Sequence, residues 1–288
     1  MLAAIMIESY LPHLFYALTW AVLWLVLLPM PEIWSGVKRI APRLTHPRLV
    51  RFWERGRTRL GAMRAYLPTM AILAVGIAIT LFVGEDFIEL AVLLRQQSPL
   101  MLDVDQSVYR WAASMRSDPA TVFFLTFTYL GSVAGLAVIV TGVAALLFAR
   151  KHRGFALYVL VTGTLSGLIN LLLKDIFART RPDLAEALRH ATGYSFPSGH
   201  AMGSMVVFGS LAYVVARVAG RWRLRSATIA LLLSSVVAVG LSRVYLGVHW
   251  ISDIGAGYAA GLVWLAVATV TFEAFWRVRK IRGSSPSS

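Results

Sequence analysis

The sequence predicts an all-α, polytopic membrane bundle with a six-helix core and one additional apolar helix at the N-terminus. Of its 288 residues 58% are hydrophobic and only 15% are charged, and the mean hydropathy is +0.68. A soluble domain carries about 25% charged residues. Apolar runs of about 20 residues, the length that crosses a hydrocarbon core, recur along the chain. The chain therefore belongs in a membrane, and its length suits one helical domain.

Six apolar stretches bounded by charge, Pro or Gly are the expected spans of the core, at roughly 67–89, 121–149, 154–173, 200–219, 226–247 and 254–276. An even number of spans places both ends of this core on one side. The connection 90–120 contains an amphipathic stretch from Val104 to Trp111. It either braces the bundle as a packed helix, which we favour, or lies in the outer interface with Tyr109 and Trp111 at headgroup level.

The chain divides into an N-terminal region 1–66, the six-helix domain 67–276 and a cytoplasmic tail 277–288 that we expect to be disordered. The apolar run 9–30 is long enough to span. A signal peptide fits it poorly, because no basic segment precedes the run and no small-residue cleavage site follows it. The basic stretch 38–64 is either an interfacial helix on anionic lipid or a solvated linker.

The net charge of +14 is explained by topology before nucleic-acid binding needs to be considered. Twenty of the 28 Lys and Arg residues fall in four segments that alternating spans place on one side: 38–64, 150–153, 217–225 and 277–282. That side should be cytoplasmic. We expect no nucleic-acid partner and a bacterial inner-membrane protein. The sequence does not specify its oligomeric state.

Three polar clusters stand at the outer ends of the predicted spans, where charge is costly and indicates function. They contain Lys174, Arg181 and Pro182; then Pro197, Ser198, Gly199 and His200; then Ser242, Arg243, His249 and Asp253. Because the spans alternate in direction, all three clusters should reach the same outer surface.

These residue types match what phosphoryl transfer needs. Lys174, Arg181 and Arg243 supply cations for phosphate oxygens, and the planar fork of arginine fits oxygen pairs. Ser198 and Gly199 precede a helix N-terminus, whose free N–H groups and dipole favour an anion. The sequence therefore predicts a phosphate-binding site.

The two histidines in these clusters have separable roles. His249 precedes Asp253 by four residues, so a helix would place both side chains on one face. A carboxylate bonded to one ring nitrogen leaves the other free to attack, which makes His249 the predicted nucleophile. His200 has no such carboxylate in its cluster and is the predicted acid for the leaving oxygen. The chain has no cysteine, and we expect no metal or cofactor.

Each element alone has a simpler explanation. A His–Asp pair can be a structural hydrogen bond, Lys174 and Arg243 can be interfacial anchors, and Ser198 can be an ordinary helix N-cap. Eleven residues at fixed spacing argue against these explanations jointly. Among their neighbours, Arg179 should contact phosphate, solvent or a lipid headgroup, and Asp175 could pair with Arg179. Tyr194 and Trp250 suit headgroup depth.

The spacing resembles the three signature motifs of the type-2 phosphatidic acid phosphatase superfamily, which includes vanadium haloperoxidases and glucose-6-phosphatases. Six residues separate Lys174 from Arg181, five separate Arg243 from His249, and three separate His249 from Asp253. The resemblance covers about 67–276. It implies a six-helix core, a phosphohistidine route without metal, and His249 and His200 in the roles given above. Pro182, Pro197 and Ser242 are supporting positions of these motifs.

The resemblance implies a lipid phosphate or pyrophosphate substrate, handled on the periplasmic side of the membrane. Undecaprenyl pyrophosphate is favoured by analogy, and phosphatidylglycerophosphate, phosphatidic acid and lipid A phosphates are alternatives. Other classes stay open: a lipid-to-lipid phosphotransferase, a vanadium haloperoxidase, and a non-catalytic scaffold or lipid transporter.

Overall fold

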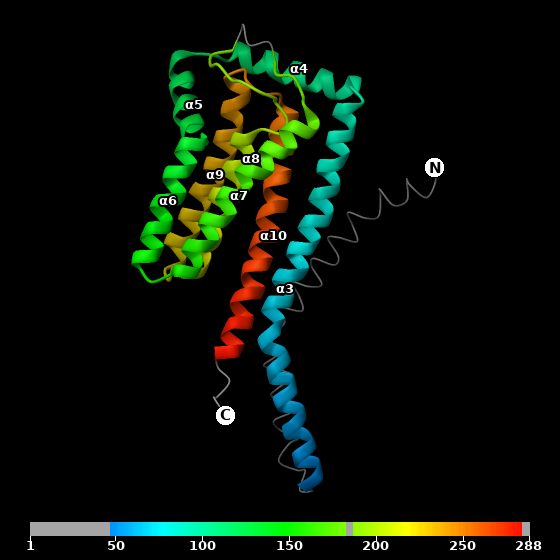
Figure 1. The fold of residues 1–288 in the computed structure, drawn as a ribbon, viewed down its shortest axis with the longest axis vertical. Coiled ribbons are helices and arrows are strands. Elements are labelled where there is room, and N and C mark those ends of the chain that lie inside the picture. Colours follow the sequence, from blue (N-terminus) through cyan, green and yellow to red (C-terminus); the bar gives the residue numbers. More distant parts are fainter. Residues whose placement is uncertain (1–46, 183–186, 284–288) are drawn as a thin grey trace, which may run out of the picture. The chain divides into compact units, whose positions relative to one another are not determined.

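The computed structural model describes residues 47–182 and 187–283, and these ranges contain helices and no strand. In chain order the helices are α3 Pro47–Arg95, α4 Pro99–Ser114, α5 Asp118–Leu130, α6 Val133–Ala149, α7 Arg153–Phe177, α8 Gly199–Val218, α9 Trp222–Tyr245 and α10 Ile251–Gly283 (Figure 1). The expected all-α architecture is confirmed. The apolar run 9–30 lies outside the described residues.

Within the described residues, four helices are long and apolar enough to cross a membrane, namely α7, α8, α9 and the part of α10 from Ile251 to Trp276. The predicted spans 154–173, 200–219 and 226–247 each agree with one of them to within about one turn. The predicted span 67–89 lies within the 49 residues of α3 and stays a prediction.

The span expected over 121–149 is not one continuous helix. The segment consists of α5 and α6, which meet at 55° and could together form one broken span. The interruption is local: the chain leaves α5 at Gly131, and the hydroxyl of Ser132 then accepts a hydrogen bond of 3.0 Å from Gly135 N and caps α6. A Gly–Ser pair is a common site of helix bending.

The domain boundary expected at residue 66 stays a prediction. By its contacts the chain divides into a unit ending at Ile72 and a unit beginning at Leu73. Helix α10 continues as far as Gly283, and the expected disorder of the tail 277–288 stays a prediction.

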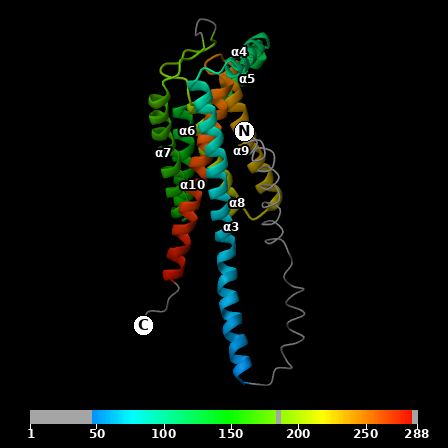
Figure 2. The same cartoon turned by 90° about the vertical axis from the view of Figure 1, so that its right-hand side faces the viewer.

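Helix α8 is the most buried helix of the described part and packs against α7, α9 and α10 (Figures 1 and 2). Small residues permit this close packing. A Cβ at Gly257 of α10 would lie 2.7 Å from the carbonyl oxygen of Ser198, and one at Gly261 would lie 3.0 Å from that of Met202. Small residues at helix contacts are typical of membrane bundles.

Helix α4 lies across one end of the bundle, as Figures 1 and 2 show. Val108 and Ala112 pack against Val244 of α9 and Ile254 of α10. The favoured interpretation of this stretch, a helix that braces the bundle, therefore agrees with the structure. Trp111, on another face of the helix, is 62% exposed.

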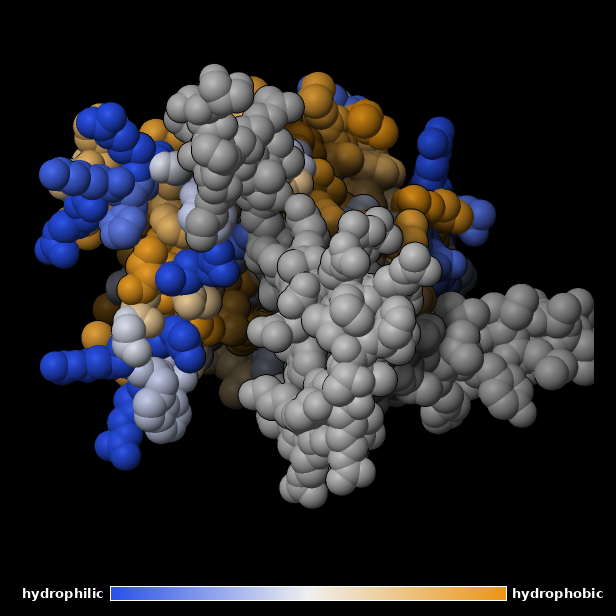
Figure 3. Space-filling view, turned by 90° about the horizontal axis from the view of Figure 1, so that it is seen from below, coloured by the Kyte–Doolittle hydropathy of each residue, from blue (hydrophilic) through white to orange (hydrophobic). Residues whose placement is uncertain are grey.

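The other end of the bundle carries exposed basic side chains. They come from the α6–α7 and α8–α9 turns and include Arg150, Lys151, Arg153, Arg221 and Arg223. Figure 3 views the molecule from this end and shows hydrophilic side chains projecting from it. The end of α7, the start of α8 and the α9–α10 turn lie at the opposite end, beside α4.

Candidate active site

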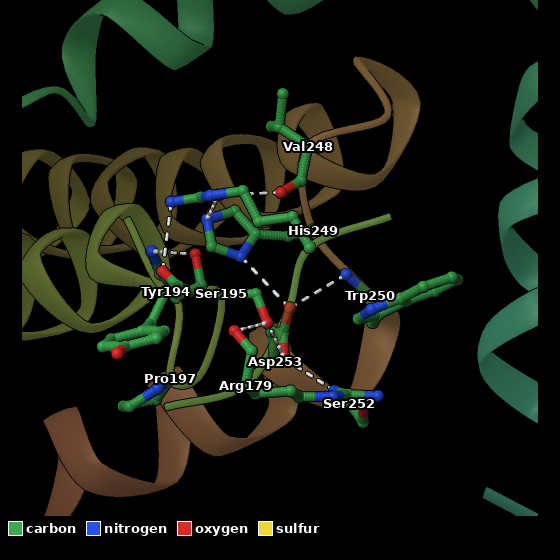
Figure 4. A network of polar contacts seen from close by, with 12 residues as sticks. Arg179, Tyr194, Ser195, Pro197, Val248, His249, Trp250, Ser252 and Asp253 are labelled. Atoms are coloured by element: carbon green, nitrogen blue, oxygen red, sulfur yellow. Dashed lines mark hydrogen bonds and ion pairs between the residues drawn. The ribbon is translucent and has the colours of Figure 1, made fainter. Parts of the chain in front are cut away.

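The three polar clusters predicted from the sequence come together at the end of the bundle that α4 covers. The backbone N–H of Ser195 donates to the carbonyl oxygen of Arg179 at 2.8 Å, which ties the start of the α7–α8 connection to its end. The N–H of Ser198 donates to the carbonyl oxygen of Asp253 at 3.0 Å, which ties α8 to α10. Figure 4 shows the side chains that these contacts assemble.

His249 and Asp253 form a buried pair. The ring Nδ1 lies 3.2 Å from Asp253 Oδ2, and the same oxygen accepts a 3.0 Å hydrogen bond from the N–H of Trp250. His249 is 2% exposed and Asp253 is fully buried. A carboxylate in this position holds the imidazole in one orientation and favours a proton on Nδ1.

The second ring nitrogen of His249 faces a cation. Arg181 Nη1 lies 3.2 Å from His249 Nε2, and because arginine can only donate, Nε2 must be the acceptor. Burial lowers the pKa of His249 to about 4, aided by the charges of Arg243 and Arg181 and opposed by Asp253. The ring is therefore neutral at pH 7, with an unprotonated Nε2.

Arg181 is held by backbone carbonyl groups on both sides. Its Nη1 also donates to Val248 O at 2.8 Å, its Nε to Gly193 O at 2.9 Å, and its Nη2 to Thr192 O and Tyr194 O at 3.0 and 3.2 Å. Burial lowers the pKa of Arg181, and the charge of Asp253 acts in the opposite direction. These bonds fix the guanidinium plane beside His249.

Lys174 and Arg243 are the other two predicted cations. Lys174 Nζ, in the last turn of α7, donates to Tyr194 O at 2.5 Å and Ser195 O at 3.3 Å. Arg243 is 4% exposed and donates from Nη1 to Thr128 Oγ1 of α5. Its buried Nε has no partner among the described residues. A buried donor without a partner is costly, and a bound phosphate oxygen would satisfy it.

The start of α8 has the geometry of an anion site. Ser198 is the N-cap, and its hydroxyl accepts from Ala201 N at 3.5 Å. A Cβ at Gly199 would lie 2.8 Å from Oδ1 of Asn170, so a larger residue here would displace this α7 side chain. Asn170 in turn donates to Pro197 O at 3.3 Å. The sequence analysis did not identify Asn170, which lies outside all three motifs.

His200 lies in the first turn of α8, at the bend between α5 and α6. Its Cδ2 atom would be 3.4 Å from a Cβ at Gly131. Within the described ranges the ring makes no hydrogen bond, and the positive charges of Arg243 and Arg181 act on it. His200 therefore lies near the cations and the other histidine, with both ring nitrogens available.

Arg179 has a role that the sequence did not predict. Its Nη1 donates to Asp253 Oδ1 at 2.7 Å and its Nη2 to Asp105 Oδ2 at 2.6 Å. The expected contact with phosphate, solvent or headgroup is therefore wrong. The expected pairing with Asp175 is also wrong, because α7 ends at Phe177 and helical spacing does not continue to Arg179.

Asp105 is the second residue that the sequence analysis missed. It projects from α4, is 1% exposed, and accepts hydrogen bonds from the N–H and hydroxyl of Ser252 at 3.0 and 2.7 Å. One feature of the sequence could have identified it: Asp105 lies on the same helical face as Val108 and Ala112, so it places an acid within an apolar stripe.

The turn that presents His249 depends on glycine. Gly247 has φ +75°, and a Cβ there would lie 2.7 Å from Nη2 of Arg116. The supporting positions Pro182, Pro197 and Ser242 are buried. The hydroxyl of Ser242 donates within α9 to Val239 O at 2.6 Å. The ring of Trp250 packs against that of Tyr109, with centroids 5.8 Å apart.

Comparison with known proteins gives a consistent result. Residues 155–277 match the PAP2 superfamily. The chain is 33% identical over 162 residues to phosphatidylglycerophosphatase B of Bacillus subtilis, an alignment that covers 55% of this chain and 78% of that protein. It is 28% identical over 145 residues to an undecaprenyl-diphosphatase of Sulfolobus acidocaldarius, covering 48% of this chain and 65% of that protein.

A solved structure agrees with the sequence comparisons. The fold resembles the crystal structure of a transmembrane PAP2-type phosphatidylglycerolphosphate phosphatase from Bacillus subtilis, with a TM-score of 0.62 and 27% identity. The similarity covers 69% of this chain and 96% of that one. With its helical spans and its three converging motifs, this chain belongs to the PAP2 superfamily and is an integral membrane phosphatase.

Proposed function

We propose that this protein hydrolyses a lipid phosphate or pyrophosphate through a phosphohistidine on His249, and that a polyprenyl pyrophosphate such as undecaprenyl pyrophosphate is its substrate. One observation carries the proposal. The Nε2 of His249 is unprotonated, faces Arg181 at 3.2 Å, and belongs to a ring whose Nδ1 is bonded to Asp253. This is the arrangement of an activated nitrogen nucleophile beside a phosphate-binding cation.

In the first step the Nε2 lone pair of His249 attacks the terminal phosphorus while the bond from that phosphorus to the leaving oxygen breaks. In a pyrophosphate the leaving oxygen is the one that bridges the two phosphates, and in a monoester it is bonded to carbon. His200 gives its proton to that leaving oxygen. The imidazole becomes cationic as the P–N bond forms, and the adjacent carboxylate of Asp253 stabilises this charge.

In the second step His200 takes a proton from water as the water oxygen attacks the phosphoimidazole. The P–N bond breaks, inorganic phosphate leaves, and both histidines return to their first protonation states. Hydrolysis and transfer to a second lipid differ only in which hydroxyl attacks here.

The cations of the site stabilise charge on the transferring group. Lys174, Arg181 and Arg243 surround it with the N-terminus of α8, and electrostatic stabilisation of this kind supplies most of the catalysis in phosphoryl transfer. The bond between Arg181 Nη1 and His249 Nε2 passes to a phosphate oxygen when substrate binds. The nucleophile and the phosphate are thereby brought to the same place.

The charge distribution supports a site on the periplasmic face. The exposed basic turns lie at the opposite ends of the helices that deliver the motifs, and such turns are retained in the cytoplasm. Exposed apolar side chains along α7 and α9, including Leu171, Leu172, Leu231 and Leu233, suit contact with lipid. A lipid headgroup can reach the site from the outer leaflet.

Phosphatidylglycerophosphate is the main rival substrate, because the Bacillus subtilis relative that is 33% identical over 162 residues is named for it. Phosphatidic acid and lipid A phosphates are further alternatives. The purified protein should release phosphate from a polyprenyl pyrophosphate faster than from these three lipids, without loss in a metal chelator. His249→Ala should abolish release from every lipid, while His152→Ala, at the exposed opposite end, should not reduce it.

If His249→Ala retained the wild-type rate, the nucleophile would be misassigned. If a glycerophospholipid phosphate were the fastest substrate, the phosphohistidine mechanism would be retained and the assignment of a polyprenyl pyrophosphate as substrate would be rejected. Vanadate-dependent halide oxidation is expected to be undetectable.

A further inference from the structure

Arg189 is a cation near the site that none of the three motifs contains. It lies in the connection between α7 and α8, is partly buried, and places its guanidinium carbon 4.5 Å from the centroid of the Tyr129 ring. Among the described residues it has no hydrogen bond and no ion pair. An aromatic face orients an arginine without using its N–H donors, so these stay available to an anion.

The position of Tyr129 locates Arg189 relative to the histidines and cations. Thr128, the preceding residue, accepts the hydrogen bond of Arg243, and Gly131 lies against the ring of His200. The charge of Arg189 acts on both His200 and Arg243. Arg189 therefore lies on the side of the site where the leaving oxygen receives its proton.

The site holds more positive charge than one phosphoryl group requires. Arg189, Lys174, Arg181 and Arg243 form no ion pair with a carboxylate in the described part of the chain. Asp253, the acid of the site, is already bonded to His249 and Arg179. Clustered cations without carboxylates favour a ligand with several negative charges.

A pyrophosphate ester and a phosphate monoester differ at this position. In a pyrophosphate the leaving oxygen is bonded directly to a second, anionic phosphate, whereas in a monoester it is bonded to carbon. A cation beside His200 has an anionic partner only with the pyrophosphate. Tyr129, which orients Arg189, is 58% exposed near the bend of α5 and α6.

We infer that Arg189, oriented by Tyr129, forms a second anion subsite for the phosphate that stays on the lipid, and so makes the enzyme selective for pyrophosphates over monophosphates. This inference rests on the proposed function. It deepens that function by naming the residue that distinguishes the two classes of substrate.

The test compares two substrates with the same tail, farnesyl pyrophosphate and farnesyl monophosphate. Arg189→Gln should lower kcat/KM for the pyrophosphate by about tenfold or more, the loss expected for one transition-state contact to a charged group, and change the monophosphate value by less than about twofold. Arg189→Lys should recover part of the loss as a point charge. The kcat/KM of Tyr129→Leu for the pyrophosphate should lie between the values of wild type and Arg189→Gln. Arg110 is an exposed arginine of α4, and Arg110→Gln should have the wild-type kcat/KM.

Equal losses on both substrates, or no loss on either, would overturn the subsite. A binding measurement separates this result from failure of the proposed function. In calorimetry, inorganic pyrophosphate should bind wild type more tightly than phosphate does, and Arg189→Gln should remove that difference. If wild type hydrolysed neither lipid, the proposed function would fall, while unchanged pyrophosphate affinity in Arg189→Gln would reject the subsite by itself.

Discussion

Arg179 donates a 2.7 Å hydrogen bond from Nη1 to Oδ1 of Asp253, the carboxylate that also holds the ring of His249. Through Nη2 the same guanidinium reaches Asp105 of α4 at 2.6 Å, and Asp105 bonds to Ser252. The His–Asp pair is thus one end of a buried network that joins α4, the α7–α8 connection and α10. Figure 4 shows Arg179, His249, Ser252 and Asp253 of this network. The orientation of His249 depends on residues that do not contact phosphate.

Loss of this network should reduce turnover more than substrate binding. In Arg179→Gln and Asp105→Asn the Asp253 carboxylate loses a fixed partner, and small misplacements of a reacting group cost about 100-fold in rate. We expect kcat to fall by about that factor with KM nearly unchanged. Steady-state kinetics on the folded, purified variants measures both.

The control for this prediction is Trp111→Phe on the exposed face of α4, which should retain wild-type kcat. A rise in KM with constant kcat in Arg179→Gln would indicate that Arg179 contacts the substrate, contrary to the network described here.

The protonation of His249 can be observed directly. Because burial lowers its pKa to about 4, the ring should stay neutral as the pH falls through the range in which an exposed histidine gains its proton. NMR of protein labelled at histidine carbon, with His249 assigned by its absence in His249→Gln, should give a midpoint near 4. A midpoint above 6 would contradict the burial and the tautomer proposed for the nucleophile.

The lowered pKa of His249 also makes the free energy of unfolding depend on pH in a predictable direction. The unfolded chain binds a proton at His249 near pH 6.5 and the folded protein only near pH 4, so stability should fall as pH decreases between these values. The thermal midpoint of wild type should therefore drop over that interval by more than that of His249→Gln. An equal drop in both proteins would argue against the shift.

Gly247 should be required for the turn that carries His249. Its φ of +75° lies in the left-handed region, where an added Cβ costs about 1–2 kcal/mol, and that Cβ would also approach Arg116 at 2.7 Å. Gly247→Ala should lower the melting temperature and the activity. Gly142→Ala, where a Cβ meets nothing within 4 Å, is the matched control and should leave both unchanged or raise the stability.

Membrane orientation can be tested because the chain has no cysteine. Cysteines placed at His190, in the α7–α8 connection, and at His152, in the α6–α7 turn, are both at exposed positions. An impermeant maleimide added to intact cells should label His190→Cys alone, and His152→Cys only after lysis. The opposite pattern would place the site in the cytoplasm.

The sequence located the helices α7 to α10 and predicted that the eleven motif residues gather at one end of the bundle, because both depend on local spacing. Hydropathy locates a span, and the distances along the chain from Lys174 to Arg181 and from His249 to Asp253 are set by helix ends and one turn. The sequence did not predict the break at Gly131, because hydropathy continues through this position and the cap that Ser132 provides for α6 is visible only in the structure.

The remaining parts of the site depend on contacts between distant segments. Asp105 meets Arg179 across 74 residues of chain, and no spacing rule connects them. Arg179 itself was misplaced because Ala178 adopts a left-handed conformation with φ 45°, which ends α7 and turns the next side chain toward Asp253. Arg189 belongs to none of the three motifs. Its contact with the Tyr129 ring, which the sequence does not reveal, places it near His200.

The most direct test of the central claim is to trap the phosphoenzyme. Protein with His200→Gln should accept labelled terminal phosphate from a lipid pyrophosphate and retain it, because the residue proposed to activate water is missing. The label should be acid-labile and base-stable, and mass spectrometry should map it to His249. It should be absent from the double variant that carries both His200→Gln and His249→Ala. Label on any other residue, or turnover by His249→Ala at the wild-type rate, would contradict a phosphohistidine at His249.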